Sequence, residues 1–235
     1  MNRFLKTCFS LFVILALPLT AAVAQPLVPD VNTTMLLHFD NDLAGAQGQI
    51  PVQASGVAFE GGVHQLGANI PAGAHLSYRS FDNLDPTNGT IEFWLKPNWN
   101  GNDGLGHTVM QCGTLGGMMI TKDGASNWRS IFNIWGAGGH PENGVIVNVS
   151  SLFQAGQWRH CAFTWSATTL NLYIDGVLQQ TAPVTIELPP IDTASHIIIG
   201  NNPFDLTPID GVIDELRISD IQRTPSEIAA SFAAS

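Results

Sequence analysis

Short runs that alternate apolar and polar residues recur along this chain, and turn residues close each of them. In residues 90–97, Ile91, Phe93 and Leu95 fall on one face of an extended segment, and Pro97 ends it. Asp175-Gly176, between two such runs, is a strong hairpin signal. The pattern predicts strands at 34–39, 90–97, 107–112, 116–121, 129–135, 144–150, 157–165, 169–174, 177–181, 196–200 and 211–219.

One segment carries convincing helix signals. Thr224, Pro225 and Glu227 supply an N-cap, a proline at the first helical position and a capping-box acid, which predicts a short C-terminal helix. Many short strands with glycine-rich turns and almost no helix indicate an all-β sandwich or barrel. Because there is no internal repeat and no long linker, we expect one domain at 34–235, preceded by a disordered lead-in at 25–33.

The first 24 residues have the three-part pattern of a secretory signal peptide. Arg3 and Lys6 precede an apolar run at 9–19, and small residues at 22–24 suit cleavage before Gln25. The run is short for a membrane span, and a retained N-terminal anchor is the alternative interpretation. We therefore expect residues 1–24 to be removed and the chain to be secreted, into the extracellular or the periplasmic space.

The charge of the chain narrows the classes of partner. Without Arg3 and Lys6, seven of the nine Lys and Arg residues remain against 19 acids, a net charge of −12. Such a chain is repelled by phosphate backbones and by anionic membranes, and it attracts cations. Nucleic-acid binding is therefore excluded.

Two cysteines follow the predicted cleavage point, Cys112 and Cys161. An even count in an oxidising compartment permits a disulfide. The alternative is two buried thiols that act as small apolar side chains. The sequence alone leaves the two interpretations open, since it does not place the Cα atoms within bridging distance.

Four stretches occur together in the order TIEFWLKP, WRHCAFTWSATTLNLYIDGVL, IIIGNN and GVIDELRISDIQRTPSEIAA. This series resembles the laminin-G-like branch of the concanavalin A-like lectin/glucanase superfamily, from about Met35 to the C-terminus. The resemblance implies an all-β jelly-roll sandwich of two antiparallel sheets, one concave and one convex. It also implies that the first and last strands lie near each other.

The last predicted strand, 211–219, places a carboxylate where an apolar side chain is expected. Alternation puts Asp214 on the buried face with Val212 and Leu216, and leaves Glu215 and Arg217 as an exposed pair on the other face. A buried, unpaired charge is very costly, so a cation or dense hydrogen bonding must offset it.

The family that the chain resembles commonly uses the carboxylate of the last strand to hold a structural calcium ion. The resemblance assigns metal ligands to Asp214, to Asp40 after the first strand, and to Gly62 in the glycine turn 60–62. Hard oxygen ligands of this kind suit calcium better than zinc. The alternative is that backbone N–H groups alone hold Asp214 and that no metal binds.

No catalytic residues are predicted. Glycoside cleavage usually needs two carboxylates across the scissile bond, and Glu92 has no acidic neighbour on its face of the strand 90–97. The E-x-D-x-x-E strand of the glucanase branch does not occur in this sequence, and the seven histidines are scattered. A glycoside hydrolase or polysaccharide lyase with an unrecognised set of acids stays open as an alternative.

A binding function is the positive hypothesis. Aromatic rings suit the apolar faces of sugars, and Asn or His supplies hydrogen bonds. We therefore predict ligand-binding residues at Trp99, Trp135, His140 and Asn143, most of them in the loop 133–143. The alternative is that each tryptophan packs in the core.

The sequence thus predicts a secreted, non-enzymatic recognition module that binds carbohydrate or a cell-surface glycan and is stabilised by calcium. An adhesive or structural protein that forms oligomers is a further alternative.

Overall fold

The computed structural model describes residues 25–113, 116–134, 142–185, 195–201 and 207–234. Its first strands are β1 (Thr33–Leu37), β2 (Gln53–Ser55), β3 (Ala58–Gly61), β4 (Leu66–Ile70) and β5 (His75–Arg79). Then follow β6 (Gly89–Pro97), β7 (His107–Cys112), β8 (Gly116–Lys122), β9 (Asn127–Ile134) and β10 (Glu142–Asn148). The last elements are β11 (Arg159–Trp165), β12 (Thr169–Ile174), β13 (Val177–Pro183), β14 (His196–Ile199), β15 (Gly211–Ser219) and the helix α1 (Pro225–Ala234).

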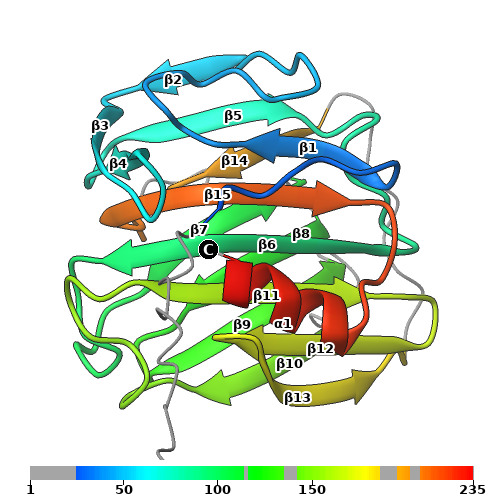
Figure 1. Ribbon diagram of the computed structural model, residues 1–235. Coiled ribbons are helices and arrows are strands. Elements are labelled where there is room, and N and C mark those ends of the chain that lie inside the picture. The colour runs from blue at the N-terminus through cyan, green and yellow to red at the C-terminus, as the bar shows by residue number, and fades with distance from the viewer. Residues whose placement is uncertain (1–24, 114–115, 135–141, 186–194, 202–206, 235) are drawn as a thin grey trace, which may run out of the picture.

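These strands form two antiparallel sheets that pack face to face (Figure 1). The larger sheet has the order β13-β12-β11-β6-β15-β4-β3, with β1 also paired to β15. The smaller has the order β10-β9-β8-β7-β14-β5-β2. The prediction of an all-β jelly-roll sandwich with a short C-terminal helix is confirmed.

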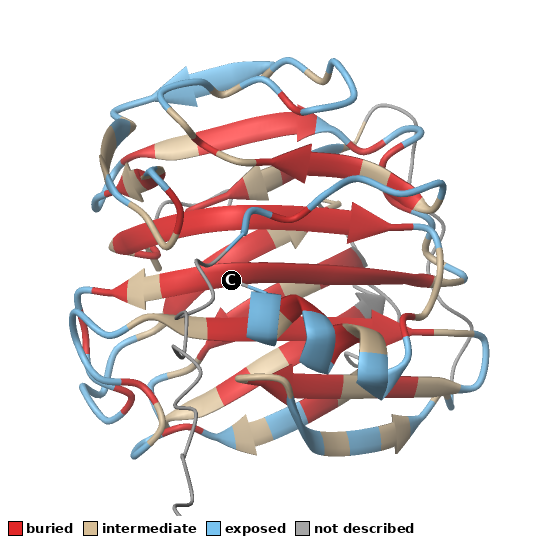
Figure 2. Cartoon of the chain, in the orientation of Figure 1, coloured by how far each residue is buried: buried red, intermediate tan, exposed pale blue. Residues whose placement is uncertain are grey.

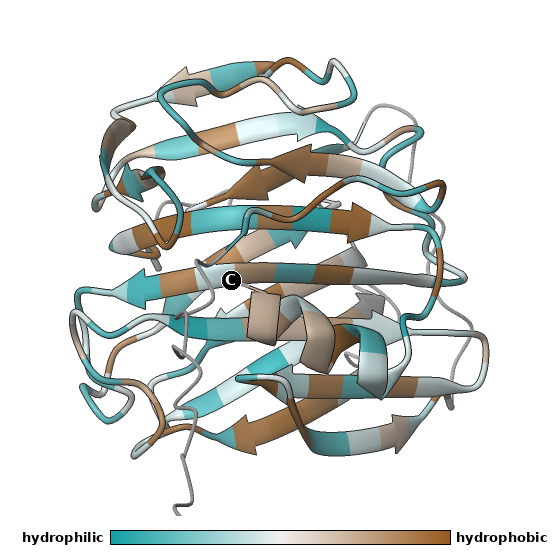
Figure 3. Ribbon diagram, viewed as in Figure 1, coloured by the Kyte–Doolittle hydropathy of each residue, from teal (hydrophilic) through white to brown (hydrophobic). Residues whose placement is uncertain are grey.

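The core lies between the sheets and is built by alternation along the strands. In β6, Ile91, Phe93 and Leu95 belong to the core, as predicted. The strands are largely buried while the loops and edges are exposed (Figure 2). Hydrophobic and hydrophilic residues alternate along several of the strands (Figure 3). Removal of this apolar surface from water is the main force that holds the sandwich together.

Two predicted local signals are confirmed. Asp175 and Gly176 both have positive φ, 51° and 73°, in the tight turn between β12 and β13, as a two-residue hairpin of this type requires. Thr224 and Glu227 form the capping box of α1, with the Thr224 N–H donating to Glu227 Oε2 at 2.7 Å and the Glu227 N–H donating to Thr224 Oγ1 at 3.3 Å.

The last strand differs from the predicted alternation. The pairing of β15 with β6 shifts register between Asp214 and Arg217, and Glu215 has a positive φ of 49°. Such a β-bulge inserts an extra residue and reverses which side chains face the core. Ile213 and Leu216 both belong to the core, so the prediction that Asp214 shares the core face with Leu216 is wrong.

The predicted exposed pair is also wrong, because Glu215 and Arg217 are both buried. Glu215 Oε2 accepts a hydrogen bond from the Leu27 N–H at 2.6 Å, and Glu215 Oε1 lies 2.7 Å from His38 Nδ1. Arg217 instead pairs with Glu92 on β6. Glu215 and Arg217, which were expected on the exposed face, therefore both have partners inside the protein.

Residues 25–32 are ordered by contacts with the C-terminal part of the chain, which differs from the expected disordered lead-in. Leu27 is buried, and the Gln25 N–H donates to the Ala234 carbonyl at 2.6 Å. Both carboxylate oxygens of Asp30 accept from Arg223 Nη2 at 2.9 Å. The two ends of the described chain thus meet, and β1 pairs with β15, so the first and last strands are adjacent as the resemblance implied.

Cys112 on β7 and Cys161 on β11 are both free, buried thiols in the core. The alternative of two apolar-like thiols describes them, and the disulfide that an even count permits is not formed. Within the described residues, no helix combines the length and the apolar character needed to cross a bilayer.

Candidate functional site

The predicted ligand residues fall into two groups. Trp135 and His140 lie outside the described residues. Trp99 is 5% exposed, stacks on the His107 ring at 4.3 Å between centroids, and donates from Nε1 to the Ile209 carbonyl at 2.6 Å. Asn143 is 2% exposed, and its Oδ1 accepts from the Thr185 N–H at 2.7 Å. Neither described residue offers much surface to a ligand.

The predicted metal ligands, in contrast, meet at one turn. The turn lies between β3 and β4, and it donates to two carboxylates. Asp214 Oδ2 accepts from the N–H groups of Val63 at 2.8 Å and His64 at 3.0 Å. Asp40 Oδ1 accepts from the Leu66 N–H at 3.0 Å. The acid after β1 and the acid of the last strand therefore both bind the glycine turn.

Gly62 is placed where this turn has no room for a side chain. A Cβ at residue 62 would lie 2.5 Å from Asp214 Oδ2 and would also press on the backbone at His64 and Leu66. At the preceding Gly61, a Cβ would meet nothing within 4 Å. The close approach of backbone to carboxylate therefore needs glycine at 62 and tolerates other residues at 61.

The buried charge of Asp214 is only partly compensated by these hydrogen bonds. Burial, and to a lesser degree the neighbouring charge of Glu215, raise the pKa of Asp214 to about 7, against the lowering effect of the backbone donors. The hydrogen bond to Glu215 raises the pKa of His38 above its ordinary value of 6.5, although burial acts against it. The site thus has an excess of negative charge that a proton or a cation would relieve.

Asp214 and Asp40 carry carboxylate oxygens, which are ligands that calcium takes. The turn contacts both carboxylates through its N–H groups, which is the arrangement of the alternative in which backbone donors hold Asp214. Within the described residues, no three His, Cys, Asp or Glu side chains come together as a ready metal cage. An ion here would accordingly rely on backbone and solvent oxygens in addition to the two aspartates.

The contacts of Glu92 indicate a structural role. It is fully buried and accepts from Arg217 through Nε at 2.8 Å and Nη2 at 2.5 Å, while His160 Nε2 lies 3.4 Å from its other oxygen. Burial alone would raise the pKa of Glu92, but His160 and Arg217 hold it below its ordinary value. Arg217 also donates to Ser231 on α1 at 2.8 Å. Glu92 therefore anchors the helix to the sheet.

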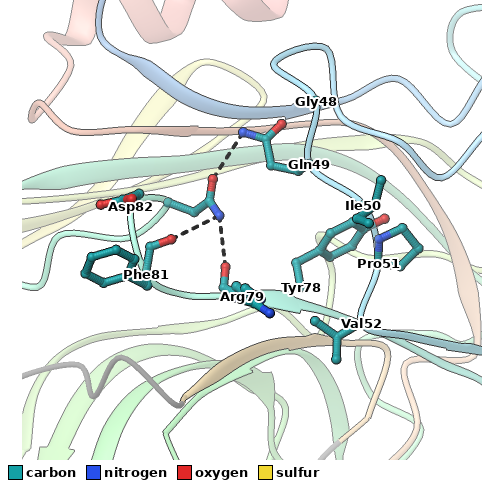
Figure 4. A pocket seen from close by; sticks show the side chains of 10 residues that line it. Gly48, Gln49, Ile50, Pro51, Val52, Tyr78, Arg79, Phe81 and Asp82 are labelled. Carbon is teal, nitrogen blue, oxygen red and sulfur yellow. Dashed lines mark hydrogen bonds between the residues drawn. The ribbon is translucent and has the colours of Figure 1, made fainter.

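An open hollow of about 450 Å³ lies at the β2 edge of the smaller sheet (Figure 4). It forms where the start of β2 meets the end of β5, because the Val52 N–H donates to the Ser77 carbonyl at 2.7 Å. Three apolar side chains line it while staying accessible: Ile50 is 74% exposed, Phe81 55% and Val52 45%. This volume is in the range of small-ligand sites, about 300–1,000 Å³.

The walls of the hollow are fixed by buried polar groups. The amide of Asn83 accepts from Gln49 Nε2 at 3.2 Å and donates to the Arg79 carbonyl at 3.0 Å, so it joins the two segments that form the walls; dashed lines in Figure 4 mark these bonds. Tyr78 also lines the hollow, and it donates from its hydroxyl to the Leu43 carbonyl at 2.7 Å. These hydrogen bonds thus hold in place the loop that carries Phe81.

A second hollow, of about 360 Å³, adjoins the first and shares Phe81, Asp82 and Asn83 with it. Asp85 and Asp220 also line this second hollow. Phe81 therefore stands between an apolar hollow and one with three carboxylates around it.

This hollow is not among the sites predicted from the sequence. Strands β2 to β5 were not predicted, and the hollow depends on their pairing. One signal was present, since Phe81 stands in a polar turn sequence, SFDN, directly after the strand that ends at Arg79. A large aromatic residue in a turn differs from Trp99, which lies in the core.

Comparisons with known proteins support the fold and the family. The sequence matches the profile of the Concanavalin A-like lectin/glucanases superfamily over residues 71–229. No curated protein matches the chain. Many solved structures do, and three of them illustrate the likeness.

The receptor binding domain of botulinum neurotoxin C/D mosaic serotype superimposes with a TM-score of 0.72 at 14% identity, over 87% of this chain and 51% of that one. The botulinum neurotoxin serotype D ligand binding domain, in complex with N-acetylneuraminic acid, gives 0.70 at 14% identity, over 87% and 51%. The binding domain of Paraclostridial Mosquitocidal Protein 1 gives 0.67 at 17% identity, over 86% and 52%.

The present chain spans about half the length of these structures, so their ligands do not transfer to it directly. At such low identity they show the fold alone. The profile match covers more than half of the sequence and ends within α1. The chain therefore belongs to the concanavalin A-like lectin/glucanase superfamily, in which it forms a lectin-fold domain.

Proposed function

We propose that this chain is a secreted, non-enzymatic carbohydrate-recognition module whose binding surface is the hollow at Phe81. The observation that carries the proposal is the exposed Phe81 ring, 55% accessible, in the wall of a 450 Å³ hollow. An aromatic face offers an apolar surface to the C–H groups of a sugar ring, and surrounding polar groups then fix its orientation.

Membership of a lectin-fold family supports this proposal but does not carry it, because one fold hosts many functions. Two of the solved structures compared above are a receptor binding domain and a ligand binding domain, and the second holds N-acetylneuraminic acid. This likeness favours recognition over catalysis for the present chain.

Export is a second part of the proposal. Its support is the arrangement of Arg3 and Lys6 before the apolar run 9–19 and the small residues at 22–24. Expression in a bacterial host followed by mass spectrometry of the secreted protein tests it. A chain that begins near Gln25 is expected, and recovery of only the full-length chain in the cell membrane contradicts it.

A structural calcium ion is the third part. Asp214, Asp40 and the turn at Gly62 would hold it, and its charge would offset the buried charge of Asp214, whose pKa is raised to about 7 mainly by burial. The ion would stiffen the junction between the turn and the last strand. We expect millimolar calcium to raise the melting temperature of the wild type relative to chelator, and Asp214→Asn to abolish that difference.

A glycan array followed by calorimetric titration of the best glycan tests the central proposal. Phe81→Ala should weaken binding by about tenfold or more, since loss of stacking costs roughly 1–3 kcal/mol at aromatic platforms, and Phe81→Trp should retain it. Leu105→Ala is the matched control, because Leu105 is 62% exposed and does not line the hollow. Its affinity should equal that of the wild type.

The predicted loop provides a competing location. If Trp135→Ala abolishes binding while Phe81→Ala leaves it intact, the ligand binds at the segment around Trp135 and not in the hollow. Absence of binding to any glycan, by protein with a cooperative melting transition, contradicts the carbohydrate proposal as a whole. Light scattering on the same sample reports whether the chain forms oligomers.

A further inference from the structure

Almost all lysine and arginine side chains in the described part of the chain form ion pairs. The structure describes seven Lys and Arg residues, and six of them lie within 4.0 Å of a carboxylate. Among the described residues, Arg79 is the exception, and it is exposed. In a chain with 19 acidic residues, an arginine without a carboxylate partner is unusual, because nearby acids gain energy by pairing with it.

Arg79 is not an isolated surface residue, since it lines the hollow beside Phe81. In the view of Figure 4 its side chain lies between Phe81 and Val52. Its backbone carbonyl is held by Asn83, which fixes the base of the side chain. His196 is its cross-strand partner on β14, so the imidazole and the guanidinium share one face of the sheet.

We infer that this hollow selects acidic saccharides, with Arg79 binding the carboxylate or sulfate of a sugar whose ring packs on Phe81. The inference rests on the proposed function and adds the class of glycan. Both required chemistries are present at one place: an apolar, accessible ring and an unpaired guanidinium. The planar fork of arginine matches an oxyanion with two parallel hydrogen bonds.

The negative charge of the rest of the protein makes the selection of acidic saccharides at Arg79 more specific. Asp82 lines the same hollow, and Asp85 and Asp220 line the adjoining one. These three carboxylates repel an acidic sugar while Arg79 attracts it, so the orientation of the sugar is fixed as well as its presence. Asp82 is then free to accept hydrogen bonds from sugar hydroxyls.

Matched pairs of probes test the inference. Lactose is compared with 3′-sialyllactose and with 3′-sulfolactose, and a galacturonic acid trisaccharide is compared with its methyl ester. Calorimetry should show each acidic member binding at least about tenfold more tightly than its neutral match, as a charge-assisted bidentate contact provides. Comparison of the carboxylated probes with the sulfated probe shows which of the two anionic groups Arg79 binds. The preference should shrink as salt is raised.

Variants distinguish the contribution of Arg79 to binding from the effect of the overall charge of the protein. Arg79→Gln should lower the affinity for the acidic probes about tenfold, to the level of their neutral matches, and leave the neutral probes unchanged. Arg129→Gln is the control, because it removes the same charge from an arginine that pairs with Glu142. Asp82→Asn should strengthen binding of the acidic probes.

The outcomes distinguish the two proposals. Two results would contradict selection of acidic saccharides and leave carbohydrate recognition standing. One is equal binding of neutral and acidic probes in a manner that depends on Phe81. The other is wild-type binding of acidic probes by Arg79→Gln. If no probe and no array glycan binds to the folded protein, both are wrong.

Discussion

Arg217 on the last strand holds Glu92 at the centre of the larger sheet, with Nε and Nη2 donating to the same carboxylate oxygen at 2.8 and 2.5 Å. The same guanidinium donates to Ser231, so one side chain connects β15, β6 and α1. The residues that the sequence presented as a family signature, the Glu of TIEFWLKP and the Arg of GVIDELRIS, are thus partners across the β6–β15 pairing.

Removal of either member should destabilise the protein strongly. Arg217→Gln leaves Glu92 charged and buried without its main partner, which typically costs about 3–5 kcal/mol of unfolding free energy. Urea unfolding monitored by tryptophan fluorescence measures it. Arg129→Gln, which breaks the partly exposed pair with Glu142, should cost less than about 1 kcal/mol. Equal losses in the two variants would show that the buried pair is not a principal anchor.

Asp214 should make the metal-free protein less stable as pH rises. Its folded-state pKa is raised from 3.8 to about 7, so the folded chain holds a proton that the unfolded chain has lost. The stability that this proton contributes is complete below 3.8, the pKa of Asp214 in the unfolded chain. It disappears as the pH rises through about 7, the pKa in the folded chain. The raised pKa of His38 acts in the same direction above 6.5. In chelator, stability should therefore fall by about 2–3 kcal/mol between pH 5 and pH 8, at 1.36 kcal/mol per pKa unit.

The variant Asp214→Asn identifies the source of this slope. Because asparagine does not titrate, the fall between pH 5 and pH 8 should shrink to the part contributed by His38, whatever the absolute stability of the variant. Asp85→Asn, on an exposed loop, should keep the wild-type slope. An unchanged slope in Asp214→Asn would mean that another group titrates in this window.

Much of the fold could be predicted because its signals are local. The hairpin at Asp175-Gly176 and the capping box of Thr224 and Glu227 depend on residues that are neighbours in sequence. The alternation in 90–97 likewise needs only the strand itself. The ligands assigned by resemblance, Asp40, Gly62 and Asp214, meet at one turn although they are far apart in the chain.

The bulge in β15 could not be predicted from the pattern, since Glu215 gives no sign of its positive φ. It exchanged the expected faces of the strand and moved Arg217 from solvent to a buried pair. The hollow was missed for a different reason. It depends on the non-local pairing of β2, a strand of three exposed residues, with β5. Neither element shows alternation long enough to recognise.

The two thiols should be inert in the folded protein. Burial raises the pKa of Cys112 to about 12 and raises that of Cys161 well above its ordinary value, so the reactive thiolate is scarce at neutral pH. Incubation with iodoacetamide, followed by mass spectrometry, should leave both unmodified in buffer and modify both in denaturant. A reductant should not change the melting temperature. Loss of two hydrogens in the intact mass would instead indicate a disulfide.

The adjacent glycines 61 and 62 offer a matched test of the turn that holds Asp214. Gly62→Ala forces a Cβ to within 2.5 Å of Asp214 Oδ2 and against backbone atoms that do not yield easily. Overpacking of this kind costs about 1–3 kcal/mol, and urea unfolding should show the loss. Gly61→Ala, whose Cβ meets nothing, should lie within about 0.5 kcal/mol of the wild type. If calcium binds here, Gly62→Ala should also reduce the calcium-dependent rise in melting temperature while Gly61→Ala preserves it. Identical unfolding curves for the two variants would show that the turn does not press on Asp214 as described.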